Sequence, residues 1–199
     1  MDLLNRLVLL ILAGTLVRAI PAHAIRYMSD AEAYEYVLGE GLVLTAETRV
    51  VDAVLSKNLE KYSGLYTPPG EVLEVQVARK DNNLVGYALM LTEKTRYRPI
   101  TFAVGIGPDG RVLKTVVVVY REPRGEQVKA ERFNAQYTGK SLTDNIRVGS
   151  TIRVVSGATV SAEVMTSGVK KALYLVDQWY LAPHAVHASS QVEFAKVRP

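Results

Sequence analysis

The 199-residue chain contains no cysteine. Without a thiol it forms no disulfide, no Cys-x-x-Cys haem attachment and no thiolate-ligated zinc or iron–sulfur site. A chain of this composition therefore cannot carry electrons on a c-type haem or an iron–sulfur cluster of its own. For redox chemistry, the simplest remaining option is an organic cofactor.

Several other common signatures are also missing. The sequence shows no internal repeat, no Ser-His-Asp arrangement, and no glycine-rich phosphate loop of the Walker or Rossmann kind. His184 and His187 stand three apart in a tail of small residues, where solvent exposure is a simpler interpretation than metal binding. We therefore predict no catalytic residue and no metal site.

Basic residues exceed acidic ones only slightly, with a formal net charge of +4. They are scattered and often stand beside acids, as in Glu93-Lys94 and Glu131-Arg132. No stripe of lysine and arginine suits a nucleic-acid backbone, so nucleic acid is not an expected partner. Mild attraction to acidic lipid or to an acidic protein stays open.

The N-terminus has the pattern of a secretory signal peptide. Arg6 precedes an apolar run from Leu7 to Val17, and Ala22-His23-Ala24 offers small residues at a cleavage site. The run is about half of the ~20 residues that a membrane-spanning helix needs. We expect residues 1–24 to be removed, which leaves residues 25–199 as a single exported domain. An uncleaved N-terminal anchor is the alternative.

Hydrophobic periodicity predicts an α+β fold, an antiparallel sheet with packed helices, whose core covers about residues 70–181. Ser29 and Glu32 have capping-box spacing, and Gly107–Gly110 is a strong hairpin signal. The run Val116–Val119 is apolar at every position, which predicts a strand covered on both faces. The predicted N-terminal helices cover 29–38 and 45–62, and the predicted strands cover 73–78, 84–91, 100–106 and 112–120.

A long helix is predicted from about Val160 to Trp179, because apolar residues recur there every three or four positions. Thr159 or Ser161 then lies at the helix N-terminus, where free backbone N–H groups and the helix dipole favour an anion. Gly157 and Ala158 leave room for a bulky group near the backbone. The alternative is that Thr159 only caps the helix.

The run Ser156-Gly157-Ala158-Thr159-Val160-Ser161 resembles the flavin-attachment motif of the FMN-binding domain family. That family includes the flavin subunits of Rnf-type complexes and of sodium-pumping NADH:quinone oxidoreductases. Other segments resemble the family in order and spacing, and together they cover about half of the chain: 86–89, 100–106, 109–112, 120–125, 133–137 and 139–140.

The resemblance implies a covalent cofactor. FMN would be esterified through its phosphate to Thr159 by a separate, Mg-dependent flavin transferase that uses FAD as donor. Ser161 offers the same hydroxyl chemistry, but Thr159 occupies the family's position. The resemblance further places a Glu-containing loop beside the flavin ring, and Tyr137 and Gly139 near the cofactor. The residues that match this loop are Glu122, Arg124 and Gly125. The alternative for these three is a polar loop that closes the sheet.

One position departs from the family. Many members carry an aspartate three residues before the motif serine, in the pattern that the transferase reads, and this chain has Arg153 there. Arg153 either helps to neutralise the FMN phosphate or is a solvated strand-edge residue. If it blocks the transferase, the chain is a non-flavinylated binding or assembly module of a membrane redox complex.

The main functional hypothesis is an exported flavoprotein that transfers electrons to or from a membrane or exported redox partner. It would work in the periplasm or on the outer face of the cytoplasmic membrane. An enzyme that reduces a small substrate directly on its flavin is a third possibility, but no acid/base constellation calls for it.

Overall fold

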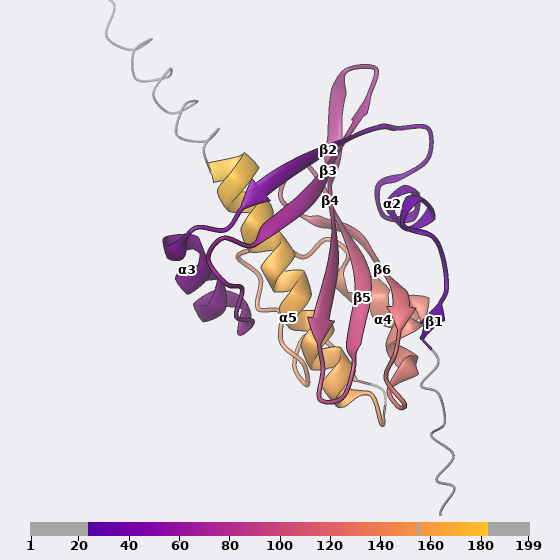
Figure 1. The fold of residues 1–199 in the computed structure, drawn as a ribbon. Coiled ribbons are helices and arrows are strands. Elements are labelled where there is room, and N and C mark those ends of the chain that lie inside the picture. The colour runs from indigo at the N-terminus through magenta and orange to yellow at the C-terminus, as the bar shows by residue number, and fades with distance from the viewer. Residues whose placement is uncertain (1–23, 155, 183–199) are drawn as a thin grey trace, which may run out of the picture.

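The computed structural model describes residues 24–154 and 156–182 (Figure 1). The predicted signal segment, apart from Ala24, and the tail that contains His184 and His187 lie outside the described residues. Within the described part of the chain, no helix is both long and apolar enough to cross a membrane.

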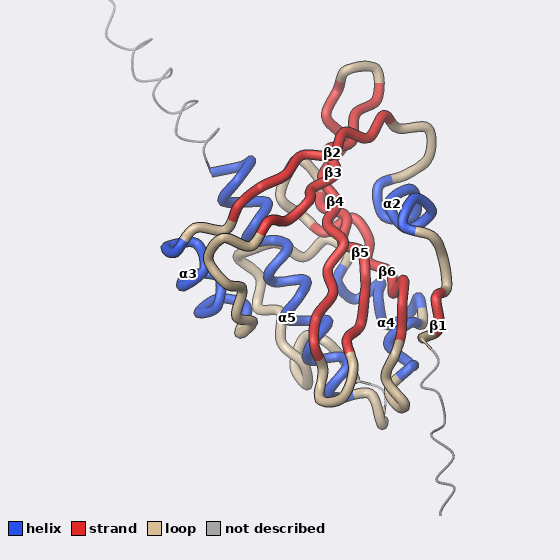
Figure 2. The backbone as a smooth tube through the Cα atoms, viewed as in Figure 1, coloured by secondary structure: helices blue, strands red, loops and turns tan. Residues whose placement is uncertain are grey.

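A six-stranded sheet forms the centre of the molecule, with strand order β1-β6-β5-β4-β3-β2 (Figure 2). Every neighbouring pair is antiparallel, which confirms the expected fold class. The predicted turn is present, since the Gly110 N–H donates to the Gly107 carbonyl at 3.0 Å between β5 and β6. The strands are β1 (Ile25–Arg26), β2 (Val43–Val50), β3 (Val72–Lys80), β4 (Asn83–Lys94), β5 (Pro99–Ile106) and β6 (Val112–Tyr120).

Helices cover both faces of the sheet (Figure 1). One face packs against α2 (Asp30–Leu38), and the other packs against α3 (Ala53–Ser63) and α5 (Thr159–Val176). The capping box predicted for the first helix is present, with reciprocal hydrogen bonds between Ser29 and Glu32. The remaining elements are η1 (Glu126–Lys129), α4 (Glu131–Asn134), η2 (Ala135–Tyr137) and η3 (Asp177–Leu181), a π-helical continuation of α5.

Two hydrophobic cores result, because side chains alternate across the strands. Residues Val116 to Val119 of β6 are each at most 9% exposed, so the prediction of a strand covered on both faces is confirmed. The core under α2 is built from alanine and valine, with Ala78, Ala88 and Ala103 fully buried. The helix lies very close to this face, since a Cβ on Gly105 would come within 2.4 Å of the Val37 carbonyl oxygen.

The predicted helix over 45–62 is wrong in its first half. Residues Val43–Val50 form the edge strand β2, which pairs with β3 along its whole length. The helix begins only at Ala53, where the Asp52 side chain caps it by accepting the Leu55 N–H at 2.8 Å. The helical spacing of residues in α3 extended the prediction backward across this cap, while β-branched residues before it favour a strand.

Candidate functional site

Three segments meet at one end of the sheet and enclose a cavity of about 230 Å³. They are the β4–β5 turn, the loop after β6 and the N-terminus of α5, and they lie at the lower end of the molecule in Figure 1. The cavity brings Glu122 and Arg124 together with residues of the 156–161 run. The lining residues are Arg96, Tyr97, Glu122, Arg124, Gly157, Thr159, Val160 and Ser161.

Thr159 is the first residue of α5 and is exposed to solvent. The N-cap position belongs to Ala158, which has no capping side chain, so the hypothesis that Thr159 is only a cap is wrong. No hydrogen bond engages the Thr159 hydroxyl within 24–154 and 156–182, and the first turn of α5 contains no acidic residue. A free hydroxyl thus stands where the helix dipole favours negative charge.

Ser161 lies two residues further on and is only 3% exposed. Its hydroxyl is 3.0 Å from the Tyr120 hydroxyl, which itself donates to the Arg124 carbonyl oxygen. Burial raises the pKa of Tyr120, so this phenol keeps its proton for that bond. Ser161 therefore stabilises the loop after β6, and its burial makes it a poor attachment residue.

Glu122 joins the two loops that border the cavity. Its Oε1 accepts the backbone N–H groups of Tyr97 at 3.1 Å and of Arg98 at 2.7 Å. Gly125 adopts a left-handed conformation with φ of +89°, and a Cβ there would lie 2.6 Å from the Ser161 hydroxyl oxygen. Only glycine allows the loop to approach α5 this closely. Glu122 and Gly125 thus fix the shape of the cavity.

Two guanidinium groups provide positive charge at the cavity. Arg96 and Arg124 both line it and are exposed, and neither takes part in an ion pair within the part of the chain that the structure describes. The Arg96 guanidinium lies 5.4 Å from the centre of the Tyr97 ring. Planar guanidinium groups that are exposed and not engaged in an ion pair can donate hydrogen bonds to a phosphate group.

Sequence reasoning missed Arg96 and Tyr97, because nothing local marks the β4–β5 turn as part of the site. The only available signal is an aromatic residue between two arginines, Arg96-Tyr97-Arg98, in a short turn between strands.

Other predicted residues lie away from this cavity. Arg153 is exposed, in a separate hollow beside Phe133, where its backbone exchanges two hydrogen bonds with the Gln136 side chain. Its position does not support a role in neutralising a phosphate in the cavity. Tyr137 is fully buried, bonds to Thr166 at 2.9 Å and does not line the cavity. Gly139 does not line the cavity either.

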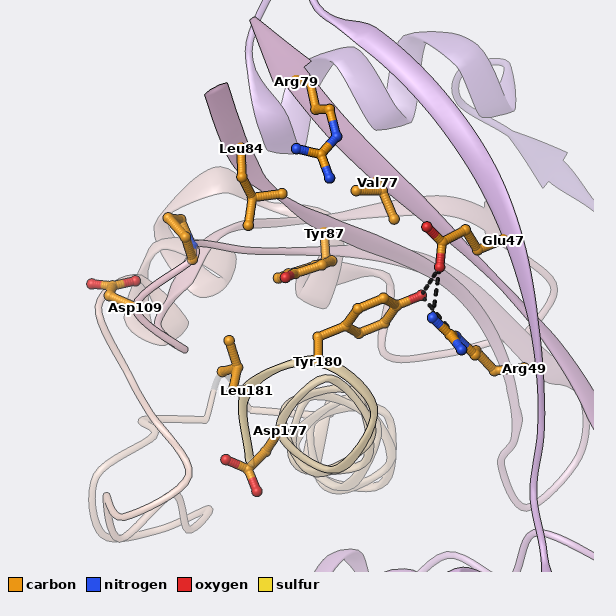
Figure 3. A pocket seen from close by; sticks show the side chains of 11 residues that line it. Glu47, Arg49, Val77, Arg79, Leu84, Tyr87, Asp109, Asp177, Tyr180 and Leu181 are labelled. Atoms are coloured by element: carbon orange, nitrogen blue, oxygen red, sulfur yellow. Dashed lines mark hydrogen bonds and ion pairs between the residues drawn. The ribbon is translucent and has the colours of Figure 1, made fainter. Parts of the chain in front are cut away.

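A larger cavity, of about 710 Å³, lies at the opposite end of α5 (Figure 3). The rings of Tyr87 and Tyr180 stack there with their centres 4.4 Å apart. The Tyr180 hydroxyl bonds to Glu47 at 3.1 Å and to Arg49 at 3.3 Å, and these two side chains form an ion pair at 2.7 Å. The polar groups on this wall thus satisfy one another. Sequence reasoning did not find this cavity, since its walls come from β2, β3, β4, the β5–β6 turn and η3.

Residues 97–174 match the model of the FMN-binding domain family. This range contains every residue that lines the smaller cavity except Arg96. The match confirms that this part of the chain resembles the FMN-binding domain family.

Two curated relatives are components of redox complexes. The chain is 28% identical, over 134 residues, to a subunit of the Na(+)-translocating ferredoxin:NAD(+) oxidoreductase complex of Acetobacterium woodii, covering 61% of this chain and 65% of the relative. It is 28% identical, over 104 residues, to a subunit of the proton-translocating ferredoxin:NAD(+) oxidoreductase complex of Clostridium ljungdahlii, covering 48% and 56%. The chain thus spans less than two thirds of the length of either relative.

Among solved structures, the crystal structure of Shewanella oneidensis NqrC aligns with a TM-score of 0.47 and 16% sequence identity. The alignment covers 66% of this chain and 82% of that one.

Proposed function

We propose that the protein carries FMN at the N-terminus of α5, with the phosphate esterified to the Thr159 hydroxyl, and that it transfers electrons outside the cytoplasm. The observation that carries this proposal is the Thr159 hydroxyl itself. It is exposed and unbonded within the described residues, and it borders a cavity that also holds Arg96 and Arg124. The family match over residues 97–174 supports the choice of cofactor.

The size of the cavity fits part of the cofactor. At about 230 Å³ it is smaller than the ~300–1,000 Å³ of pockets that enclose a whole ligand. We infer that it takes the phosphate and the adjoining ribityl chain. The flavin ring would then rest on Tyr97 and Val160, which are 65% and 45% exposed. A ring held at the surface suits electron exchange with another protein.

The charges around Thr159 also suit a phosphate diester, which carries one negative charge at neutral pH. Arg96 and Arg124 supply guanidinium donors, and the free N–H groups at the start of α5 supply the positive end of the helix dipole. Gly157 and Ala158, immediately before Thr159, place no long side chain between the hydroxyl and solvent.

Attachment is a phosphoryl-transfer step without oxidation or reduction. The Thr159 oxygen forms a bond to the phosphorus of the FMN half of FAD, the bond between the two phosphates breaks, and AMP leaves. The hydroxyl proton passes to a base of the Mg-dependent flavin transferase. Once bound, FMN supplies reversible electron uptake, while the protein's own residues hold it and shape its surroundings.

The names of the relatives support a place for this protein in a larger assembly. Their names describe subunits of Na(+)- or proton-translocating ferredoxin:NAD(+) oxidoreductase complexes. We propose that this chain likewise serves a membrane redox complex as its flavin-bearing subunit, exported by the segment 1–24. A covalent link suits an exported carrier, because a dissociated flavin would be lost by dilution.

Mass spectrometry tests the proposal directly. The chain is co-expressed with a flavin transferase, and the expected gain equals FMN minus one water, located in peptide Ser156–Lys170. Thr159→Ala should abolish the gain. Ser161→Ala is the matched control and should keep it. A flavin retained in Thr159→Ala, or no flavin in the wild-type chain, would contradict the proposal.

The alternative of a non-flavinylated assembly module rests on Arg153, which replaces the family's aspartate and is exposed. If Arg153 prevents recognition by the transferase, the wild-type chain stays unmodified and Arg153→Asp gains the flavin. A wild-type chain that is fully modified excludes this alternative.

A further inference from the structure

The rim of the proposed flavin site carries more positive charge than its cofactor requires. The β4–β5 turn and the loop after β6 hold four arginines, here called the arginine rim: Arg96, Arg98, Arg121 and Arg124. Three of them are exposed and Arg121 is half-buried. Across 24–154 and 156–182, none of the four is in an ion pair.

The one carboxylate in these two loops is engaged elsewhere. Glu122 accepts the N–H groups of Tyr97 and Arg98, so it fastens one loop to the other instead of pairing with a guanidinium group. Four arginines and one glutamate give the two loops a net charge of about +3. Because these hydrogen bonds hold the loops together, the positive charges are presented on a fixed surface.

Two of the four arginines have no evident role in holding FMN. Arg96 and Arg124 line the cavity and suffice for the single charge of a phosphate diester. Arg98 and Arg121 do not line it, and the Arg121 guanidinium instead donates to the Thr101 hydroxyl at 3.0 Å. Their charge therefore acts on whatever approaches this end of the molecule.

We propose that the arginine rim is the docking surface for an acidic redox protein, which exchanges electrons with the flavin on Thr159. This inference rests on the proposed function. An electron-transfer partner has to bring its cofactor close to the flavin, and these two loops border the cavity beside Thr159. A protein with a negative surface would be steered there by long-range attraction, which raises association rates and weakens with salt. An anionic membrane could also bind the positively charged rim, but it would cover the flavin without supplying or accepting electrons.

Stopped-flow reduction of the flavinylated protein tests the proposal. The probe is reduced flavodoxin, a small acidic carrier, from which one electron passes to the attached flavin. We expect the second-order rate to fall about tenfold between low and high ionic strength. Arg98→Glu/Arg121→Glu should lower the low-salt rate by about tenfold and flatten the salt dependence. Equal rates and equal salt dependence in both proteins would overturn the proposal.

Two controls separate docking from general effects. Arg79→Glu makes the charge change of one rim substitution, such as Arg98→Glu, at an exposed position of β3 in the wall of the larger cavity, and it should leave the rate unchanged. Reduced methyl viologen, a small cation, should reduce the double variant at least as fast as the wild type. Arg98→Glu alone, which leaves the bond from Arg121 to Thr101 intact, should show an intermediate effect even if the double variant folds poorly.

Further measurements distinguish the remaining outcomes. Flavin absorbance is recorded first, since a colourless protein contradicts the proposed function alone. Docking is then tested by calorimetry of oxidised flavodoxin with the unmodified chain. Binding that weakens with salt and is lost in the double variant would support the arginine rim as the docking surface. Cosedimentation with anionic vesicles tests whether the arginine rim binds a membrane instead. A double variant that loses vesicle binding but keeps the wild-type rate with flavodoxin would overturn the proposal.

Discussion

Thr159 and Ser161 show how two similar residues in one motif acquire different roles. They are two positions apart, and since each helical residue turns by about 100°, they point to nearly opposite sides of α5. Thr159 is therefore exposed, while Ser161 is buried against Tyr120 and Gly125. The helix geometry, and not the chemistry of the hydroxyls, makes Thr159 the more accessible of the two.

Gly125 is the residue on which the loop geometry depends most. An alanine Cβ at this position would lie 2.6 Å from the Ser161 hydroxyl oxygen and 2.9 Å from the Tyr120 hydroxyl, at a φ of +89°. We expect Gly125→Ala to lower the free energy of unfolding by about 1–3 kcal/mol, measured by urea denaturation. It should also reduce flavin incorporation, because the loop with Arg124 moves away from α5.

Gly139→Ala is the matched control for Gly125→Ala. Gly139 also has a left-handed φ, +77°, but nothing lies within 4 Å of the position of its Cβ. The unfolding free energy of Gly139→Ala should fall by only about 1 kcal/mol, which is the cost of the left-handed backbone conformation, and the variant should keep its flavin. Equal losses in the two variants would show that contact with Ser161 is not what requires glycine at position 125.

At the scale of elements, α5 is fixed to the sheet by close packing and by one buried ion pair. Gly168 lets the helix approach β5, since a Cβ there would lie 2.3 Å from the Phe102 ring. Lys171 reaches Glu93 of β4, with 3.0 Å between Nζ and Oε1, and their side chains are 5% and 11% exposed. These contacts fix the helix that carries Thr159 relative to the turn that carries Arg96.

The ion pair predicts a pH-dependent variant. Burial raises the pKa of Glu93, and Lys171 partly opposes that rise. In Lys171→Met the carboxylate loses its partner, which should cost about 3–5 kcal/mol of unfolding free energy near pH 7.5. An acid whose pKa is raised by folding stabilises the fold when protonated, and this contribution disappears as pH rises through the folded-state pKa. The deficit should therefore be smaller at pH 5.

Urea unfolding of the wild type and Lys171→Met at the two pH values checks this expectation. The double variant Glu93→Gln/Lys171→Met has no carboxylate at position 93. Its deficit in unfolding free energy should therefore be nearly the same at pH 7.5 and at pH 5. A deficit of Lys171→Met that does not change between pH 7.5 and pH 5 would mean that Glu93 does not titrate in this range.

At the scale of the whole molecule, the larger cavity and the cavity beside Thr159 lie at opposite ends of α5. The helix and its π-helical continuation run from Thr159 to Leu181, which is about 33 Å at 1.5 Å per residue. Sites this far apart, with no shared partners, usually respond to mutation independently. The family match also ends at residue 174, before Tyr180 and the rest of η3. The larger cavity is therefore separate from the proposed flavin site.

Tyr180→Phe tests that separation. The variant keeps the ring against Tyr87 but removes the hydroxyl that bonds to Glu47 and Arg49. The unfolding free energy should fall by about 1 kcal/mol, and flavin incorporation by the transferase should equal that of the wild type. Mass spectrometry after co-expression measures the incorporation, and a marked loss of flavin would show that the two ends are coupled.

Local sequence patterns determined much of the fold. The capping box at Ser29, the turn at Gly107–Gly110 and the apolar run of β6 each act through neighbouring residues, and each is present in the structure. The position of Thr159 at a helix start is equally local, because it depends on the periodicity of the residues that follow it. Periodicity misplaced β2, where a helix-like pattern crossed the cap at Asp52, and it did not indicate the two-residue strand β1.

Tertiary structure decided the composition of the site. Arg96 and Tyr97 reach the cavity only because β4 and β5 end beside α5, and Glu122 then fastens their turn to the loop after β6. Folding likewise buried Ser161 while leaving Thr159 exposed. Such contacts join residues far apart in the chain, and hydrophobic periodicity and motif spacing describe only near neighbours. The sequence alone therefore determined that Thr159 and Ser161 lie at a helix start, and the packing of distant segments determined which of the two is exposed and which side chains surround it.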